Sequence, residues 1–393
     1  MPHSVSRHEL YNDLFIAYHK AIVHKSDKRC VKECEKRLDT IIRQLSDELY
    51  ERRYHPRPSS CFIVKHPKKR EVFAADFIDR IIHHYIFMKT HVLFERTFIH
   101  DTYSCIKKRG THYGIQRLRH HIESCSENYT RPCYVLKMDV KGYFMHIDRL
   151  LLSNIVDKTL DHMAIRPSDM DGLRWEEKID IGFMKYLCRE VIMSDPTEGC
   201  IIHGDRSDWD GLPDSKCMFL VPKGYGLPIG NLTSQLFSNV FLNQLDQYVK
   251  RTLRCKHYGR YVDDFFLIST DRHKLHRWAK EIEKFLSDGL HISINKGKTQ
   301  VCDVRHGVEF LGAYIKPWRI YISNQSLRRM HRQIPSLMKK EPEQQMQSIN
   351  SFLGILGHYN SYRERNKLVQ QVDVTRIGYM TDGDYRKIWR WEE

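Results

Sequence analysis

The sequence predicts an α+β fold built on a mainly antiparallel sheet with helices packed on one face. Three observations support this class. Apolar residues repeat with helical spacing over long segments, as in residues 30–53. Short runs rich in β-branched and aromatic residues, such as residues 134–140, have the composition of strands. These segments interleave without the regular strand–helix alternation of a doubly wound parallel sheet, so an antiparallel sheet fits better.

Periodicity and turn residues give the expected elements in chain order. Helices are predicted for 8–25, 30–53, 76–98, the stretch after 112 up to 125, 147–160, 178–194, 231–253, 272–287, and for a basic tail from 325. Strands are predicted as a pair within 59–75, at 134–140, as a hairpin over 256–270, and near 298–304, 308–315 and 319–323. Residues 195–224 are acidic and rich in glycine and proline, so we expect them to be irregular.

The composition is that of a basic protein with a sizeable core. The 393 residues are 41% apolar, and the formal charge of +15 is spread over the chain. Such a charge favours an extended anionic partner, with nucleic acid ahead of a membrane. The N-terminus lacks the apolar core of a secretory signal, and no run reaches transmembrane length. Eleven scattered cysteines without a CxxC pair indicate reduced thiols in a cytoplasmic protein, not a disulfide framework or zinc site.

Two other polar groups favour structural interpretations. His83 and His84 adjoin a helix that has one apolar face, which favours core or capping roles over catalysis. The acids of the 195–224 segment lack the spacing of an EF-hand, so we expect a solvated insertion and no calcium loop. These acids are Asp205, Asp208, Asp210 and Asp214.

The stretch "GRYVDDFFLIST" places two adjacent acids, Asp263 and Asp264, inside a run of strand-forming residues. Successive side chains on a strand point to opposite faces, so two acids in mid-strand would bury at least one charge. A hairpin tip avoids this cost, and a solvated turn is the simplest interpretation. However, Asp139 lies near the end of another apolar strand, "YVLKMDV". Carboxylates that converge from two strands are suited to hold paired divalent cations for phosphoryl transfer.

Five segments then occur in the order of the palm blocks of a reverse transcriptase, which they resemble. They are "KMDVKGYF", "GLPIGNLTSQLFSN", "RYVDDFFLIS", "NKGKT" and "VEFLGAYI". Upstream, "KHPKKREVFAADFIDRIIHHYI" resembles the finger blocks, so the resemblance covers roughly residues 60–365. It implies a right-hand polymerase, with an N-terminal helical extension at 1–58, fingers and palm at 59–322, and a helical basic thumb at 323–393.

A narrower resemblance involves "GLPIGNLTSQ" together with "FERTFIHDTYSCIKKRGTH". Both are similar to the reverse transcriptases of diversity-generating retroelements. In most reverse transcriptases this helix block resembles PQG followed by SP, but here Ile229 and Gln235 replace its Gln and second Pro. The resemblance implies an RNA-directed DNA polymerase that makes error-prone, adenine-biased cDNA from a template-repeat RNA for mutagenic retrohoming. Its implied partners are template RNA, a cDNA or target DNA primer, dNTPs and a small basic accessory protein that forms an oligomeric ring.

The same resemblance assigns a metal site. Asp139 and Asp263 would ligate two Mg²⁺ ions, for which Mn²⁺ can substitute, and Asp264 would complete the site. The main-chain carbonyl of Val140 is an expected extra ligand. Lys298 is expected to protonate the leaving pyrophosphate, although the nearby Lys296 keeps this choice open.

Other residues are expected to contact the nucleotide or the primer. Arg70 would grip the triphosphate with Lys69 or Lys68 beside it, since these cations suit phosphate; a solvated basic turn is the alternative. Phe144 would exclude a ribose 2′-OH, with ordinary core packing as its alternative. The remaining assignments are Ile229 and Gly230 beside the nucleotide, and Phe310, Leu311 and Gly312 as the primer grip.

Two alternatives compete with the retroelement interpretation. The first is another bacterial reverse transcriptase, from a retron, a group II intron or a phage-defence system. Retron enzymes usually carry NAxxH and VTG signatures, and the sequence contains neither. The second is a catalytically silent RNA-binding scaffold, against which the intact acids Asp139, Asp263 and Asp264 argue. The sequence leaves open the roles of residues 1–58 and 195–224 and the physical basis of an adenine bias.

Overall fold

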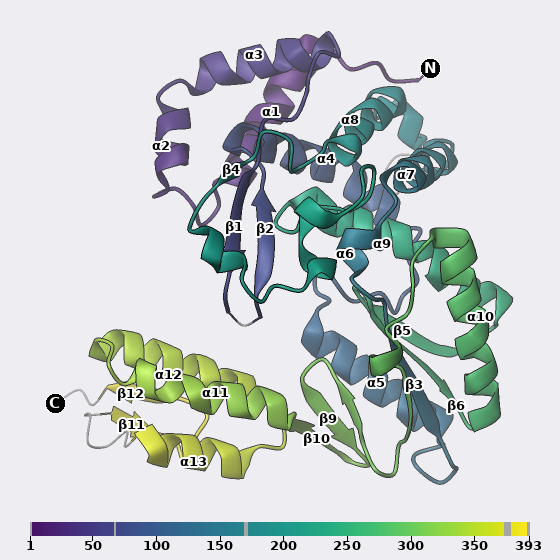
Figure 1. Cartoon of the computed structure of the whole chain (residues 1–393), viewed down its shortest axis with the longest axis vertical. Coiled ribbons are helices and arrows are strands. Elements are labelled where there is room, and N and C mark those ends of the chain that lie inside the picture. Colours follow the sequence, from purple (N-terminus) through teal and green to yellow (C-terminus); the bar gives the residue numbers. More distant parts are fainter. Residues whose placement is uncertain (1, 67, 169–171, 373–378, 391–393) are drawn as a thin grey trace.

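The computed structural model describes residues 2–66, 68–168, 172–372 and 379–390. Figure 1 shows a large body that contains the N-terminal helices and the main sheet, with a separate group of C-terminal helices, α11, α12 and α13, beside its lower end. The architecture is α+β, as predicted, and its parts are called palm, fingers and thumb after the expected right-hand polymerase. No described helix is long and apolar enough to cross a membrane.

The palm is a four-stranded sheet with the order β5-β6-β3-β7, in which every pairing is antiparallel. Its strands are β3 (Tyr134–Asp139), β5 (His257–Tyr261), β6 (Asp264–Ser269) and β7 (Gln300–Asp303). The predicted antiparallel sheet and the predicted 256–270 hairpin are therefore confirmed. Asp139 is the last residue of β3 and lies directly opposite Asp264 on β6.

Both faces of this sheet are buried, because its strands are apolar on both sides. Leu136 and Leu267 face the main core, which includes helices α7 (Arg149–Ala164), α9 (Leu232–Gln247) and α10 (Arg272–Leu290). Val135 and Phe266 face a second core, formed with α5 (Thr111–Cys125) and the strand pair β8–β9. Helices were expected on one face, but α5 also covers the other.

The N-terminal residues belong to the main core. Helix α1 (Arg7–Ala21) packs against α3 (Leu38–Tyr50) and α4 (Phe77–Glu95), and α8 (Ile181–Met193) packs against α4 and α7. The predicted single helix over 30–53 is instead two helices, because the chain leaves helical geometry at Arg37, between α2 (Arg29–Glu35) and α3. The division into three parts at 58 and 322 stays a prediction.

The finger strands β1 (Ser60–Val64) and β2 (Arg70–Ala74) form the expected antiparallel pair, and β4 (Ile201–Ile202) adds a short parallel strand beside β1. The 195–224 segment is otherwise irregular, as predicted, with short 3₁₀ turns. However, it is fixed to the fingers and is not simply solvated. Buried Glu71 accepts hydrogen bonds from Trp209 Nε1 at 2.6 Å and from the Met218 amide. Asp208 forms a 2.7 Å ion pair with Lys65.

The C-terminal region differs from the prediction at two places. The expected strand at 308–315 is broken at Leu311 and Gly312 into β8 (Val308–Phe310) and β9 (Ala313–Lys316), which continue into β10 (Arg319–Ile322). The helical tail contains α11 (Asn324–Leu337), α12 (Pro342–Leu356) and α13 (Tyr362–Val372) around an apolar core of their own. It also contains a hairpin, β11 (Tyr379–Thr381) and β12 (Ile388–Arg390), that the sequence pattern did not indicate.

Candidate active site in the palm

Three carboxylates converge at one end of the palm sheet. Asp139 ends β3, Asp264 begins β6, and Asp263 lies in the two-residue turn between β5 and β6. One oxygen of each lies within 4.8 Å of the other two. This group is the metal-ligand cluster found among the described residues, and its donors are the hard oxygen atoms that Mg²⁺ prefers.

The electrostatics of the cluster fit a divalent cation. Burial and the nearby Asp139 raise the pKa of Asp263 to about 6. Burial and the charge of Asp263 also raise the pKa of Asp264. Asp139 is buried and the other two acids are half-buried. Three acids this close repel one another when ionised, and a bound cation would relieve that repulsion. Val140 is buried directly after Asp139, and its amide donates a 3.3 Å hydrogen bond to the Asp263 carbonyl, which ties the two acid-bearing segments together.

Lys298 is the lysine that the fold brings to these acids. Its Nζ donates to both carboxylate oxygens of Asp139, at 2.9 and 2.8 Å. Lys296 instead forms an exposed 3.3 Å ion pair with Glu283. Asn295, which we did not predict, donates from Nδ2 to Asp139 at 3.2 Å and from its amide to the Asp139 carbonyl at 2.7 Å. The position of Asn295 in "NKGKT" was the available clue.

The turn that carries Asp263 has an unusual backbone. Val262 has a φ of +55°, a conformation that is rare for a β-branched residue and persists only where the surroundings enforce it. Two hydrogen bonds hold it: the Val262 amide donates to Ser104 Oγ at 3.2 Å, and its carbonyl accepts from Arg260 Nη1 at 2.9 Å. The position of Asp263 therefore depends on residues outside the hairpin tip.

Arg260 is itself fully buried and paired with Asp246 of α9. The guanidinium donates from Nε and Nη2 to the two Asp246 oxygens at 2.8 and 2.7 Å, a bidentate geometry. Tyr258 and Thr102 donate to the same carboxylate at 2.6 and 3.2 Å. Sequence reasoning missed this pair. One pattern could have indicated it: an Arg inside an apolar strand, together with an Asp on the apolar face of a helix.

Phe144 lies on the short helix α6 (Tyr143–His146), five residues after Asp139 in the chain. Its ring is half-buried and meets the Tyr143 ring edge-on, with 5.4 Å between centroids. Its carbonyl accepts from the Leu227 amide at 2.8 Å. The partly exposed ring is compatible with both the sugar-excluding role and the packing alternative, so the role stays a prediction.

Ile229 and Gly230 join the fingers to α9. The Ile229 carbonyl accepts from the Phe73 amide of β2 at 3.0 Å. Its side chain packs on a small buried cluster that includes Phe73 and Met145. Gly230 has a φ of +129°, and a Cβ there would lie 2.9 Å from Val72 Cγ1, so this contact between backbone and strand requires glycine.

The residues predicted to bind the triphosphate have different surroundings in the structure. Arg70 begins β2 with an exposed side chain, and its charge partly offsets the rise in the pKa of Asp263. Arg70 therefore acts electrostatically on the carboxylates. Lys69 instead donates from Nζ to the Asp210 carbonyl at 2.5 Å, and Lys68 is exposed in the turn.

The predicted primer-grip residues lie at the end of β8 and in the turn to β9. Phe310 is buried and meets Phe266 of the palm edge-on, with 5.3 Å between ring centroids. Leu311 and Gly312 have φ values of +49° and +82°. A Cβ on Gly312 would lie 2.9 Å from Ser326 Oγ at the start of the thumb.

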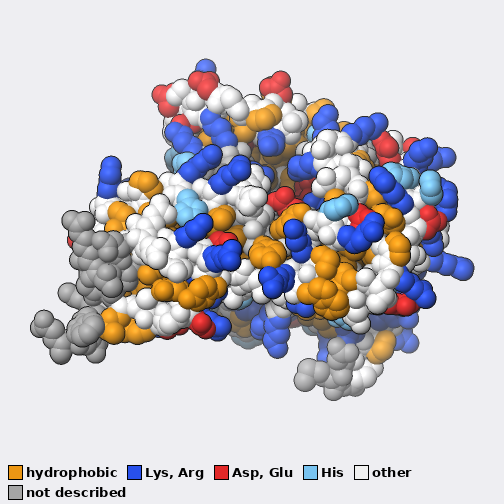
Figure 2. Space-filling model, turned by 90° about the horizontal axis from the view of Figure 1, so that it is seen from below, with side chains coloured by type: hydrophobic (Ala, Val, Ile, Leu, Met, Phe, Trp, Pro, Cys, Tyr) orange, Lys and Arg blue, Asp and Glu red, His pale blue; other side chains and the backbone are white. Residues whose placement is uncertain are grey.

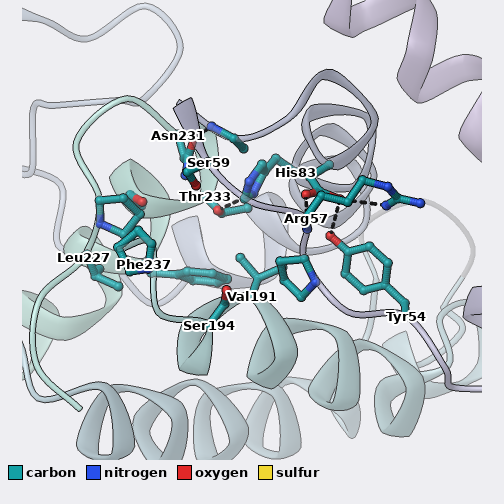
Figure 3. A pocket seen from close by; sticks show the side chains of 16 residues that line it. Tyr54, Arg57, Ser59, His83, Val191, Ser194, Leu227, Asn231, Thr233 and Phe237 are labelled. Atoms are coloured by element: carbon teal, nitrogen blue, oxygen red, sulfur yellow. Dashed lines mark hydrogen bonds and ion pairs between the residues drawn. The ribbon is translucent and has the colours of Figure 1, made fainter. Parts of the chain in front are cut away.

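A second cluster of polar side chains lies beside the start of α9 (Figure 3). Thr233 Oγ1 and His83 Nδ1 form a 2.7 Å hydrogen bond, and burial lowers the pKa of His83 to about 3. Asp79, one turn earlier on α4, accepts from Tyr54 and from the Arg57 amide at 3.0 and 2.6 Å. The buried, neutral His83 agrees with the predicted core role. These contacts tie Tyr54 and Arg57 to α4, and His83 of α4 in turn bonds to the start of α9.

Comparisons with known proteins bear on this site. Residues 214–315 match the family model described as "Reverse transcriptase (RNA-dependent DNA polymerase)", a span that contains Asp263, Asp264 and Lys298 but begins after Asp139. Protein YkfC of Escherichia coli (strain K12) is 24% identical over 310 residues, which cover 70% of this chain and 71% of that protein.

Among solved structures, the chain is similar to telomerases of two yeasts. Telomerase from Candida albicans, in complex with a fragment of telomeric RNA, has 12% identity and a TM-score of 0.45, over 80% of this chain and 55% of that chain. Apo telomerase from Candida tropicalis has 12% identity and a TM-score of 0.46, over 82% of this chain and 59% of that chain. The chain thus spans little more than half the length of these telomerases.

The family match and the geometry of the palm agree with each other. The matched span contains the hairpin that carries two of the three acids, and the antiparallel pairing of β3 with β6 brings the third into place. The chain therefore carries a reverse transcriptase domain and is, by enzyme class, an RNA-directed DNA polymerase.

Proposed function

We propose that this polymerase copies a template-repeat RNA into error-prone, adenine-biased cDNA for mutagenic retrohoming, as a diversity-generating retroelement requires. One observation carries the proposal: Ile229 occupies a position where most reverse transcriptases have Gln, and its apolar side chain packs on the buried cluster between fingers and palm. The resemblance of "GLPIGNLTSQ" and of residues 94–112 to that group supports it.

The chain's own residues define the chemistry of each addition. Asp139, Asp263 and Asp264 would hold two Mg²⁺ ions, or Mn²⁺ as a substitute, with the Val140 carbonyl as an extra ligand. Such ions, when bound, stabilise the attacking and leaving oxygens of an in-line phosphoryl transfer. Lys298, beside Asp139, would give a proton to the pyrophosphate that leaves.

The nucleotide would be held between the fingers and the palm. Arg70 would contact its triphosphate, since a guanidinium binds phosphate oxygens with paired hydrogen bonds. Phe144 would lie beside the sugar and exclude a 2′-OH. Gly230 would allow the close backbone approach between β2 and the start of α9 that places Ile229.

Ile229 accounts for low fidelity in physical terms. An isoleucine offers no hydrogen bond, whereas a glutamine can donate and accept. The loss of one hydrogen bond to a correct pair costs roughly 0.5–1.5 kcal/mol. The upper end corresponds to about a tenfold loss of discrimination. The missing hydrogen bond would raise the error rate, while the preference for adenine rests on the resemblance.

The proposed partners are the template RNA, a cDNA or target DNA primer, dNTPs and a small basic accessory protein. Figure 2 shows Lys and Arg side chains spread over one face of the molecule, among apolar patches. This distribution agrees with the formal charge of +15 and suits phosphate backbones.

The test is cDNA synthesis by the purified chain on a defined, primed RNA template, followed by sequencing of the products. The proposal predicts magnesium-dependent synthesis with errors concentrated opposite template adenines. An accurate product, or errors spread evenly over the four bases, would contradict it and favour another bacterial reverse transcriptase. Failure to incorporate any nucleotide would favour the silent RNA-binding scaffold.

A further inference from the structure

A groove of about 1190 Å³ is lined by residues of helices α7, α9 and α10 and by residues just after α4. Figure 1 shows where these helices lie. None of the predicted catalytic, nucleotide-binding or primer-grip residues lines it. Its volume exceeds the roughly 300–1,000 Å³ of small-molecule pockets, so a segment of a polymer fits it better than a metabolite.

One wall of the groove is a row of basic side chains. Lys158 and His162 are four residues apart on α7, and Arg166 follows four residues later, just beyond the helix. This spacing places them on one side, one helical turn or about 5.4 Å apart. All three are exposed, and the Arg166 Nη2 and His162 Nε2 atoms are 3.1 Å apart.

The acids of the same helix point elsewhere. Asp157 and Asp161 form 2.7 Å ion pairs with Arg189 and Lys185 of α8. No Asp or Glu is found among the described residues that line the groove. Within the described part of the chain, no ion pair occupies Lys158. Among the described residues, therefore, no acid neutralises the positive charge of the α7 wall.

The opposite wall combines a further cation with oriented amides. Asn243, Gln247 and Arg251 are spaced by four residues along α9 and its extension. Gln247 Nε2 donates to the Thr97 carbonyl at 2.9 Å, and Arg251 Nε donates to Gln247 Oε1 at 2.9 Å. A guanidinium has five N–H donors, so Arg251 keeps donors for an anion.

The floor between these walls is apolar. It includes Leu151, Ile155 and Phe285, and the Phe285 ring stacks on Tyr248 with 4.2 Å between centroids and an angle of 9°. Cations above an apolar and aromatic floor are the features with which proteins bind unpaired nucleotides, since phosphates meet the cations and bases stack below.

We propose that this groove binds a single-stranded segment of RNA outside the catalytic cleft. The cations of both walls contact its phosphates, and the floor receives the bases. The side-chain amide of Gln244, which also lines the groove, contacts sugar hydroxyls or base edges. The identity of that RNA as the uncopied flank of the template rests on the proposed function. The binding of single-stranded RNA is inferred from the side chains that line the groove.

The experiment uses the full chain with its catalytic cleft occupied by a chain-terminated primer–template duplex and the next dNTP. A fluorescein-labelled single-stranded RNA of about ten nucleotides is titrated into this complex, and its anisotropy is measured over a range of salt concentrations. The test variant is Lys158→Ala/Arg251→Ala, with one cation removed from each wall. Lys280→Ala/Lys284→Ala is the charge-matched control, because both lysines are exposed on α10 and do not line the groove.

The wild-type complex should bind the labelled RNA. The test variant should bind it more weakly, with a salt-dependence slope smaller by about 1.4, the value for two lost phosphate contacts on a single strand. The control should keep the wild-type slope, and both variants should extend a short primer–template normally. Three results would overturn the proposal: no binding by the filled wild-type complex, an equal loss in the control, or equally tight binding of DNA of the same sequence. Errors opposite template adenines are measured in a separate experiment. Failure of the proposed function would therefore show in the cDNA errors, and failure of the groove proposal would show in the anisotropy titration.

Discussion

The β5–β6 turn and the Ile229–Gly230 junction both place residues that we propose act in nucleotide addition, but different forces hold them. Buried charged hydrogen bonds fix the turn, from Arg260 to the Val262 carbonyl and to Asp246. One backbone hydrogen bond from Phe73, apolar packing and a glycine fix the junction. Polar networks impose direction and distance, whereas apolar contacts mainly fill volume. The turn should therefore decide whether synthesis occurs, and the junction how accurate it is.

Loss of a shared carboxylate should have the largest effect. Asp139→Ala or Asp263→Ala removes a ligand expected to serve both ions, so nucleotide incorporation should be abolished while the protein stays folded and binds RNA. Primer extension and RNA binding measured on the same samples test this. Incorporation above a few per cent of the wild-type rate would show that the acid is not a metal ligand. Asp264→Ala should be less severe.

Loss of the buried Arg260–Asp246 pair, which holds the β5–β6 turn, should have the second largest effect. Arg260→Met leaves Asp246 charged and buried without its cation, which costs about 3–5 kcal/mol of folding stability. The double variant Arg260→Met/Asp246→Leu should recover much of that stability, because apolar replacement of a whole buried pair is often neutral. It should not recover incorporation, because the Val262 carbonyl still lacks its donor. Urea unfolding and primer extension separate the two effects, and full activity in the double variant would disprove the positioning role.

Phe144 lies between the carboxylates and the Ile229–Gly230 junction in the chain of contacts. It follows the strand that ends at Asp139, and its carbonyl accepts a hydrogen bond from the amide of Leu227, two residues before Ile229. Phe144→Ala should admit ribonucleotides far more readily than wild type, since steric exclusion ends when the excluding ring is removed. Competition between a dNTP and the matching rNTP on one template measures this. Unchanged sugar selectivity in a folded, active variant would assign the ring to core packing.

The metal-free cluster should also make stability depend on pH. The pKa of Asp263 is raised to about 6 in the folded protein, so its proton is bound more tightly there than in the unfolded chain. The free energy of unfolding in EDTA should therefore rise as pH falls through 6. The pKa of Asp79 is also raised to about 6, so Asp263→Asn is the necessary reference. Parallel pH curves for the two proteins, or equal stabilisation of both by Mg²⁺ at pH 7, would contradict the proposed site.

The sequence predicted the parts of the site that depend on local pattern. The hairpin, the strand that ends at Asp139 and the helix after Gly230 all follow from short-range periodicity and turn residues. The Arg260–Asp246 pair did not follow, because its partners are fourteen residues apart in different elements and meet only through packing. The attachment of the 195–224 segment through Glu71 spans 138 residues to Trp209.

The helix and the strand whose predicted bounds were wrong have a related cause. Apolar spacing continues across 30–53, so nothing local indicated the break at Arg37 between α2 and α3. The strand pattern at 308–315 also continues through Leu311 and Gly312, where the backbone turns sharply. Gly312, with its φ of +82°, was the available clue to a turn.

The most direct test of the central claim compares Ile229→Gln with wild type on one defined RNA template. A restored amide can hydrogen-bond near the nucleotide and favour correct pairs by roughly 0.5–1.5 kcal/mol. The side chain sits only partly buried beside β2, so the variant should remain folded and active. Deep sequencing of the cDNA should show fewer errors opposite adenine, by up to about tenfold, with smaller changes opposite the other bases. Equal adenine error rates in two comparably active enzymes would contradict the account.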